Sequence, residues 1–165
     1  MKYILPNIEK KMINVVLEKD IEDWKPEEAK KIIKTFLKSN KIKIDALLAP
    51  NDLTAGACIE ALAEKKLDGK IPVTGQDAEL AAVKRILTGK QSMTVFKDTR
   101  ILAAKAVELA KKISSGEQIS NMSNGFVNNG KKDVFSYLFE PVLVDKNSVD
   151  AVLIQSGYLK KEEVY

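Results

Sequence analysis

The stretch Asp45-Ala-Leu-Leu-Ala-Pro-Asn-Asp-Leu-Thr-Ala-Gly-Ala-Cys-Ile-Glu-Ala-Leu62 decides the fold of this chain. Its apolar run Ala46–Ala49 indicates a buried strand, and a proline ends that run. Asn51 and Asp52 follow, and apolar residues then recur at helical spacing over 53–62. In an open parallel sheet, ligands bind at the carboxyl ends of strands, which is where such a polar corner lies. Asn51 is therefore a candidate ligand-binding residue.

The bulk composition indicates one globular domain with a sizeable core. The chain has 165 residues, of which 45% are hydrophobic and 30% charged, and its net charge is +4. The basic excess lies on lysine-rich helix faces such as Lys30-Lys31 and Lys111-Lys112, with no accompanying aromatic or arginine cluster. We therefore expect solvated faces rather than a nucleic-acid partner.

Cysteine and histidine usage excludes several chemistries. Cys58 is the single cysteine, so no intrachain disulfide can form, and the sequence has no histidine. We expect Cys58 to be a small buried residue rather than a nucleophile, because no histidine can activate it. No metal, no cofactor and no membrane span is expected. The first residues lack the apolar core of a signal peptide, so an exported protein would be represented here in mature or truncated form.

Strand and helix patterns alternate over most of the chain. Apolar or β-branched runs predict strands at Met12–Leu17, 42–49, 71–75 and 92–96, and helical spacing predicts helices at Pro26–Lys38, 53–67, 78–87 and 101–113. The first residues to Lys11 resemble the tail of a helix. This alternation predicts an α/β fold with a mostly parallel sheet and right-handed crossovers.

The pattern changes after residue 113. Residues 114–125 are predicted to form a loop, and Asn128-Asn129-Gly130 a turn. Val134–Val144 is predicted to be extended, with an edge or a bend at Pro141 because proline lacks a ladder donor. A last helix over 147–155 is expected, with Asn147 as its N-cap.

Three polar corners directly follow predicted strands: Asn51, Asp77 and Lys97. Parallel strands bring such corners to one edge of the sheet. An amide, a carboxylate and an ammonium group together suit a small polyhydroxylated ligand. Trp24, the single tryptophan, lies in a loop on the same edge and offers an apolar plate for the C–H face of a sugar ring.

Each of these residues also has a purely structural interpretation. Trp24 could pack into the core at a helix start, Asp77 could be a helix N-cap, and Lys97 could be a surface lysine. Asp52 is expected to be the N-cap of its helix. An acid–base pair of Asp52 and Asp77 is conceivable, but nothing in their spacing requires it.

Five segments resemble type I periplasmic sugar-binding proteins, and most closely the D-xylose-binding branch that serves ABC importers. They are Asp23-Trp24-Lys25-Pro26-Glu27, Asn51-Asp52-Leu53-Thr54-Ala55-Gly56, Gly75-Gln76-Asp77-Ala78, Met93-Thr94-Val95-Phe96-Lys97 and Asn128-Asn129-Gly130-Lys131-Lys132-Asp133-Val134. The resemblance extends over essentially the whole chain.

The resemblance implies one lobe of a doubly wound, mostly parallel α/β fold and a binding protein rather than an enzyme. It implies that Trp24 stacks on the pyranose and that Asn51, Asp77 and Lys97 form hydrogen bonds with its hydroxyls. The sugar-binding core is expected over 1–97, a helix and loop over 98–133, and a return strand with a C-terminal helix over 134–165.

The resemblance also implies a missing half. Members of the family have about twice this length and two lobes, and the first lobe is absent here. The helix over 98–113 is expected to pack on that lobe, or on a second chain, through Leu102, Val107 and Ala110. We therefore expect weak sugar binding by this chain alone. The location implied is the periplasm or the cell surface.

Several functions stay open from the sequence. The sugar could be delivered to an ABC permease or reported to a membrane sensor kinase, and the site residues would be identical. The effector domain of a LacI-type repressor shares the fold, although the tryptophan segment favours the transport family. A sugar-processing enzyme is disfavoured by the absence of histidine and of a clear carboxylate pair.

Overall fold

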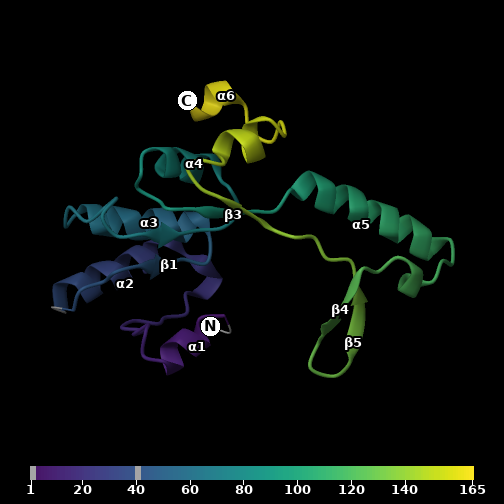
Figure 1. Cartoon of the computed structure of the whole chain (residues 1–165), viewed down its shortest axis with the longest axis horizontal. Coiled ribbons are helices and arrows are strands. Elements are labelled where there is room, and N and C mark those ends of the chain that lie inside the picture. Colours follow the sequence, from purple (N-terminus) through teal and green to yellow (C-terminus); the bar gives the residue numbers. More distant parts are fainter. Residues whose placement is uncertain (1–2, 40–41) are drawn as a thin grey trace.

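The computed structural model describes residues 3–39 and 42–165. The helices are α1 Leu5–Glu9, α2 Pro26–Ser39, α3 Asp52–Ala63, α4 Leu80–Leu87, α5 Thr99–Ser114 and α6 Lys161–Val164. The strands are β1 Leu47–Leu48, β2 Val73–Thr74, β3 Thr94–Phe96, β4 Gly125–Asn128, β5 Asp133–Ser136 and β6 Val142–Val144. In Figure 1, α2, α3 and α4 form the body, with α6 above α4 and α1 below α2, and α5 and the β4–β5 hairpin project from that body.

Short strands pair in three ladders. β1 runs parallel to β2, β6 runs antiparallel to β3, and β4 and β5 form an antiparallel hairpin. A parallel bridge between Thr74 and Met93 and a hydrogen bond of 3.1 Å from Gly75 N to Met93 O hold β3 beside β2. The strands therefore lie in the order β1, β2, β3, β6. The first three strands are parallel, and β6 is antiparallel to β3.

The predicted doubly wound, mostly parallel sheet is present only in fragments. The predicted strand Met12–Leu17 is wrong: the segment forms no ladder, because no strand of the described chain lies along it to pair with. The predicted strand over 42–49 is reduced to Leu47–Leu48, and it is not buried, since Leu48 is 65% exposed. Within the described residues β1 pairs along one edge only, so nothing extends the sheet over it.

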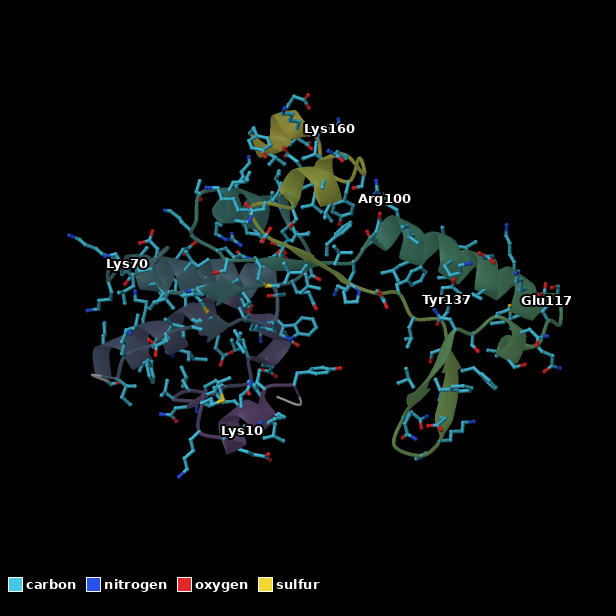
Figure 2. All side chains as sticks on the ribbon, viewed as in Figure 1. Lys10, Lys70, Arg100, Glu117, Tyr137 and Lys160 are labelled. Atoms are coloured by element: carbon cyan, nitrogen blue, oxygen red, sulfur yellow. The ribbon has the colours of Figure 1, made fainter. Side chains whose placement is uncertain are left out.

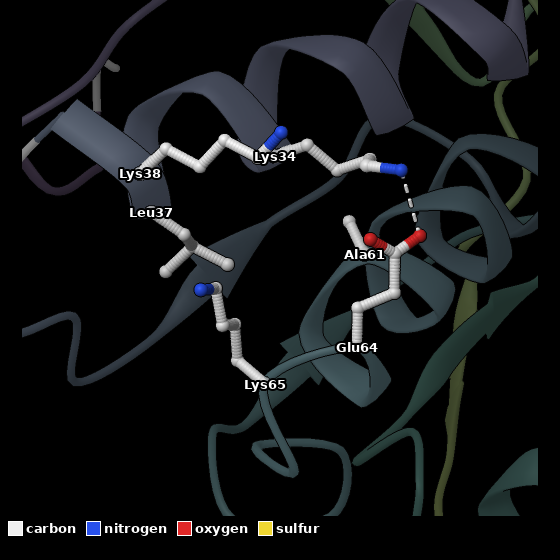
Figure 3. Close-up of a pocket in the computed structure, with 6 residues that line it drawn as sticks. All are labelled: Lys34, Leu37, Lys38, Ala61, Glu64 and Lys65. Atoms are coloured by element: carbon white, nitrogen blue, oxygen red, sulfur yellow. Dashed lines mark ion pairs between the residues drawn. The ribbon is translucent and has the colours of Figure 1, made fainter.

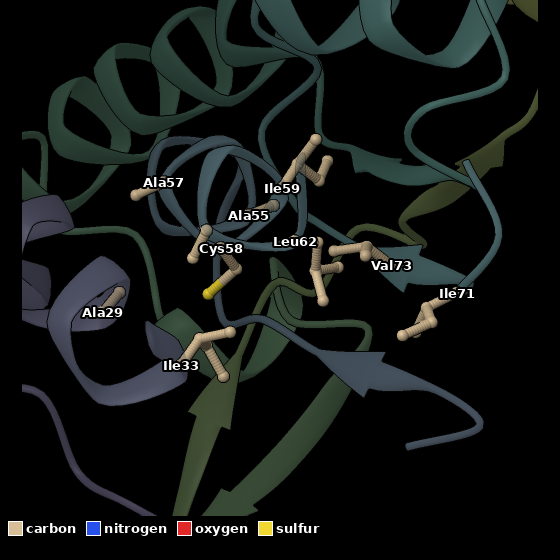
Figure 4. Packing of buried hydrophobic residues seen from close by; sticks show 10 residues of the cluster. Ala29, Ile33, Ala55, Ala57, Cys58, Ile59, Leu62, Ile71 and Val73 are labelled. Atoms are coloured by element: carbon tan, nitrogen blue, oxygen red, sulfur yellow. The ribbon is translucent and has the colours of Figure 1, made fainter. Parts of the chain in front are cut away.

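Helix α2 forms where the sequence predicts it. Pro26 opens the helix with a backbone angle suited to the first turn, and Glu27 and Glu28 face the positive end of its dipole. Ala29 and Ile33 are buried against α3, and Figure 4 shows Ile33 beside Cys58 in the resulting core. The predicted burial of Cys58 is confirmed.

Helices α2 and α3 run side by side in the same direction. Lys30 Nζ lies 2.7 Å from Glu60 Oε2, and Lys34 Nζ lies 2.9 Å from Glu64 Oε1. Because both partners advance by four residues, the two helices are parallel. Their N-terminal ends therefore lie at the same end of the pair.

A second core cluster joins α4 to the C-terminal segment. Val83 and Ile86 of α4 pack with Phe96 of β3, Val144 of β6 and Leu153. The predicted cap Asn147 is wrong, because its own amide donates to Asp145 Oδ1 at 2.9 Å. Asp145 is the residue that organises this turn, since its Oδ1 accepts from the successive amides of Asn147 and Ser148.

Helix α5 forms as predicted but has no buried residue. Its Val107 is 56% exposed, and Ile101, Leu102 and Ile113 are exposed as well. Its base is tied to the body, where Arg100 Nη1 donates to Gly157 O at 3.0 Å and the guanidinium lies 5.2 Å from the Tyr158 ring centre. Figure 2 shows Arg100 at this junction.

The segment after α5 agrees with the predicted turn and bend. The Asn128-Asn129-Gly130 turn joins β4 to β5, and Gly130 has a φ of 86°. The chain leaves β5 before Pro141 and enters β6 after it, as the missing proline donor requires. Among the described helices, none is long and apolar enough to cross a membrane.

Candidate functional site

Backbone hydrogen bonds join the three polar corners. The amide of Asp52 donates to Gln76 O at 2.9 Å, which ties the corner after β1 to the corner after β2. The amide of Asp77 donates to Val95 O at 2.8 Å, which ties the second corner to β3 just before Lys97. The predicted convergence of the corners on one edge is therefore present in the structure.

Asp77 and Lys97 form an ion pair at this edge. Lys97 Nζ lies 3.1 Å from Asp77 Oδ1, and the side chains are 40% and 42% exposed. Asp77 is not a helix N-cap, because α4 follows Glu79 and has no side-chain cap. Lys97 is likewise not an isolated surface lysine. Both groups keep hydrogen-bonding capacity that faces solvent.

Asn51, rather than Asp52, is the N-cap of α3. Asn51 Oδ1 accepts from Thr54 N at 2.9 Å and from Thr54 Oγ1 at 2.6 Å. The prediction that Asp52 is the cap is therefore wrong. Within the described part of the chain the Asn51 amide nitrogen donates no hydrogen bond, so its two N–H groups are available to a ligand.

Trp24 is not packed in the core. The residue is 62% exposed. It follows Asp23 in a tight turn, in which Asp23 has a φ of 53° and Trp24 a φ of 52°. Trp24 directly precedes α2, whose N-terminal end lies at the same end of the helix pair as that of α3. Residue 24 therefore lies at the end of the helix pair that carries Asn51, and its side chain is exposed.

Asp52 is fully buried, and its hydrogen bonds link the segments that carry the three corners. Its Oδ1 accepts from Gln91 Nε2 at 2.7 Å, and its Oδ2 accepts from Thr94 Oγ1 at 2.9 Å and from Glu79 N at 3.0 Å. Thr94 Oγ1 in turn accepts from Ala78 N at 3.1 Å. These bonds occupy the carboxylate, so it does not pair with Asp77 for acid–base chemistry.

Arg85 and Gln91 complete what we call the Asp52 network, which consists of Asp52, Arg85, Gln91 and Thr94. Arg85 Nη2 donates to Asp52 O at 2.8 Å, and Arg85 Nε donates to Gln91 Oε1 at 3.0 Å. Burial raises the pKa of Asp52, while its hydrogen bonds and the Arg85 charge act in the opposite direction without cancelling that rise. Burial lowers the pKa of Arg85.

Gly75 is required by the close approach of this network. A Cβ at Gly75 would collide with Asp52 Oδ1 and would lie 2.5 Å from Gln91 Nε2. The Gly75-Gln76-Asp77 segment therefore brings the Asp77 corner against the buried carboxylate. The sequence pattern did not indicate Arg85, Gln91 or Thr94, because each lies in an ordinary helix, loop or strand and their partners are distant in sequence.

The hollow drawn in Figure 3 lies elsewhere. It is a small space of about 10 Å³, enough for about one water, between α2 and α3. Its lining residues come from the C-terminal half of α2, the end of α3 and the two residues after α3, and they include the Lys34–Glu64 ion pair. It therefore lies away from the polar corners, at the opposite end of the helix pair.

Metal and thiol chemistry find no support at this edge. In residues 3–39 and 42–165, no group of three or more His, Cys, Asp or Glu side chains could hold a metal ion. Burial raises the pKa of Cys58 to about 11, which keeps its thiol protonated at neutral pH. What the edge offers is an exposed apolar plate, amide donors, a carboxylate and an ammonium group.

Comparisons with known proteins show the family of this chain. Residues 1–118 match the family model described as a periplasmic binding protein domain. A D-xylose-binding periplasmic protein of Haemophilus influenzae is 42% identical over 165 residues, which are 100% of this chain and 49% of that protein. The chain thus spans about half the length of the curated relatives it matches.

Solved structures of solute-binding proteins are also similar to this chain. An ABC transporter solute-binding protein from Clostridium phytofermentans, with bound beta-D-glucose, superposes with a TM-score of 0.82 at 31% identity, covering 100% of this chain and 54% of that one. A carbohydrate transporter solute-binding protein from Chloroflexus aurantiacus, in complex with D-glucose, has a TM-score of 0.76 at 38% identity, covering 85% and 42%.

Proposed function

We propose that this chain, which belongs to the family of periplasmic binding protein domains, binds a monosaccharide. It does so as one lobe of the solute-binding component of an ABC sugar importer. D-Xylose is the first candidate, because the Haemophilus influenzae relative is named for it. The observation that carries the proposal is the convergence of Asn51, Asp77 and Lys97 on one edge. Binding, and not catalysis, is the activity proposed.

Each corner has a distinct task in this proposal. The Asp77 carboxylate accepts hydrogen bonds from sugar hydroxyls, and the Lys97 ammonium donates to hydroxyl or ring oxygens. The Asn51 amide donates through its free N–H groups, while its oxygen stays committed to the cap of α3. The exposed indole of Trp24 covers the C–H face of the ring.

The ion pair between Asp77 and Lys97 prepares the site. Each charge holds the other at 3.1 Å in the free chain, so neither side chain must be ordered from a fully mobile state when the sugar arrives. Lower ordering costs favour binding. The sugar hydroxyls then take part in hydrogen bonds with both charged groups.

A second wall of the cleft has to come from another lobe. The uncovered apolar residues of α5, among them Leu102 and Val107, support a surface that packs on such a lobe or on a second chain. Export to the periplasm or cell surface is proposed with this function, as the curated relative is a periplasmic protein. An ABC permease, or a membrane sensor kinase reading the same site, is the proposed membrane partner.

The test is an NMR titration of the ¹⁵N-labelled chain. The single tryptophan gives one indole N–H signal, so Trp24 reports binding without ambiguity. We expect D-xylose to shift this signal and the amides of Asn51, Asp77 and Lys97, with an affinity weaker than micromolar because half the cleft is absent. Xylitol, which carries hydroxyls but no ring, is the control and should produce smaller shifts. The absence of any xylose-dependent shift would refute the proposal.

A further inference from the structure

The turn that carries Asp77 has an unfavourable backbone conformation. Asp77 has a φ of 102° and Ala78 a φ of 54°, so two successive residues with side chains occupy the left-handed half of conformational space. Such conformations cost free energy and persist only where the surrounding structure imposes them. The turn therefore needs an identifiable restraint.

Three successive amides supply that restraint. Asp77 N donates to Val95 O at 2.8 Å, Ala78 N donates to Thr94 Oγ1 at 3.1 Å, and Glu79 N donates to Asp52 Oδ2 at 3.0 Å. Two of the three acceptors are the side chains of Thr94 and Asp52. The Thr94 hydroxyl also donates to Asp52 at 2.9 Å, so the two side chains form one rigid buried pair.

We propose that Thr94 and Asp52 are positioning residues of the sugar site: they hold residues 77–79 in the strained turn that directs the Asp77 carboxylate to Lys97 and to the ligand. This inference rests on the proposed function. Neither residue touches the sugar, because both are fully buried. They act through the backbone of the turn, and their loss moves Asp77 relative to Asn51 and Lys97.

A positioning role differs from a purely structural one in what it changes. A structural role alters the stability of the fold and leaves the affinity of the folded fraction unchanged. A positioning role alters that affinity, because hydrogen bonds weaken steeply when the distance or angle between donor and acceptor departs from the favoured geometry. Affinity and stability are therefore measured on the same variants.

The experiment compares three hydroxyl variants by the xylose titration followed at Trp24, each checked for folding by thermal unfolding. Thr94→Val removes the hydroxyl at nearly constant shape, and Thr94→Ser retains it. Thr74→Val is the matched control, because the Thr74 hydroxyl of β2 makes no hydrogen bond with any described residue. We expect about tenfold weaker binding for Thr94→Val, which is the effect of weakening one hydrogen bond to a charged group. The Thr94→Ser and Thr74→Val chains should bind like the parent.

A fourth variant tests the link to backbone strain. Glycine adopts positive φ without steric cost, so Ala78→Gly should recover part of the affinity that Thr94→Val loses when the two changes are combined. If Thr94→Val does not fold, Thr94→Cys, which keeps a weak donor, takes its place and should also weaken binding. Equal xylose affinity of the folded Thr94 variant and the parent would overturn the positioning role alone. A parent chain that binds no xylose would instead overturn the proposed function, and this inference with it.

Discussion

The ammonium of Lys97 lies 3.1 Å from the Asp77 carboxylate at the edge of the sheet, although the two residues leave different strands. Both side chains are partly exposed, so their attraction is weakened by solvent and contributes little to folding. Their proximity matters chiefly for a ligand, which meets a donor and an acceptor of opposite charge already held side by side.

Replacement of Lys97 by methionine should weaken sugar binding and leave stability nearly unchanged. Methionine retains much of the apolar stem but removes the charged donor, which we expect to lower the affinity for xylose about tenfold or more. Xylose titration and thermal unfolding measure the two effects. Lys43→Met is the matched control, since Lys43 pairs with Asp45 at 2.7 Å outside the site. Similar affinities for the two variants would contradict the assigned role of Lys97.

Replacement of Gly75 by alanine should destabilise the chain strongly. The added Cβ collides with the buried Asp52 carboxylate and with Gln91, so the Asp52 network has to shift. We expect a loss of about 2–4 kcal/mol of unfolding free energy, measured by urea denaturation. Gly125→Ala is the comparison, because its Cβ meets only Leu138 Cδ1 at 3.7 Å, an ordinary contact outside the Asp52 network. A Gly75→Ala chain as stable as the Gly125→Ala chain would argue against a rigid network.

The stability difference between the parent and Asp52→Asn should depend on pH. Burial raises the pKa of Asp52 above its ordinary value of 3.8, so the folded chain binds this proton more tightly than the unfolded chain. As pH rises from about 4 through the raised value, charging Asp52 costs the parent stability, and the asparagine variant escapes that cost. Urea unfolding at a series of pH values measures the difference, in which the other carboxylates cancel. If the parent instead gained stability relative to Asp52→Asn as the pH rises, the pKa of Asp52 would be lowered in the folded chain, which contradicts the prediction.

Replacement of Val107 by serine should leave the stability of this chain within about 0.5 kcal/mol, because the residue is 56% exposed and lies on a helix without buried residues. Leu153→Ala is the contrast: that side chain is fully buried, and its truncation should cost about 2–5 kcal/mol. If α5 is a docking surface, Val107→Ser should also reduce binding of a fluorescent apolar dye. A destabilising Val107→Ser change would mean that α5 packs on the body of this chain in solution.

The sequence predicted the helices better than the strands, for a physical reason. Helical spacing is a local property, so the apolar positions of α2 and the capping region of α3 could be recognised from neighbouring residues. A strand depends on a partner distant in sequence. Met12–Leu17 has strand-like composition yet forms no ladder, and Leu48 is exposed because β1 pairs along one edge only.

The corners themselves were predictable, and the network beneath them was not. Strand and helix order indicated that Asn51, Asp77 and Lys97 converge. The choice between Asn51 and Asp52 as the cap of α3 could not be made locally, since both side chains can cap a helix. Contacts distant in sequence make this choice. Gln91 and Thr94 bind the Asp52 carboxylate beside Gly75 in the interior, so Asn51 is the residue that caps α3.

A nuclear Overhauser measurement between the Trp24 ring protons and the C–H protons of bound D-xylose tests directly whether the pyranose lies at this edge of the sheet. We expect contacts from one face of the sugar to the indole, together with shifted amides at Asn51, Asp77 and Lys97. Sugar that shifts none of these residues, or that binds without contact to Trp24, would contradict the placement of the pyranose at this edge of the sheet.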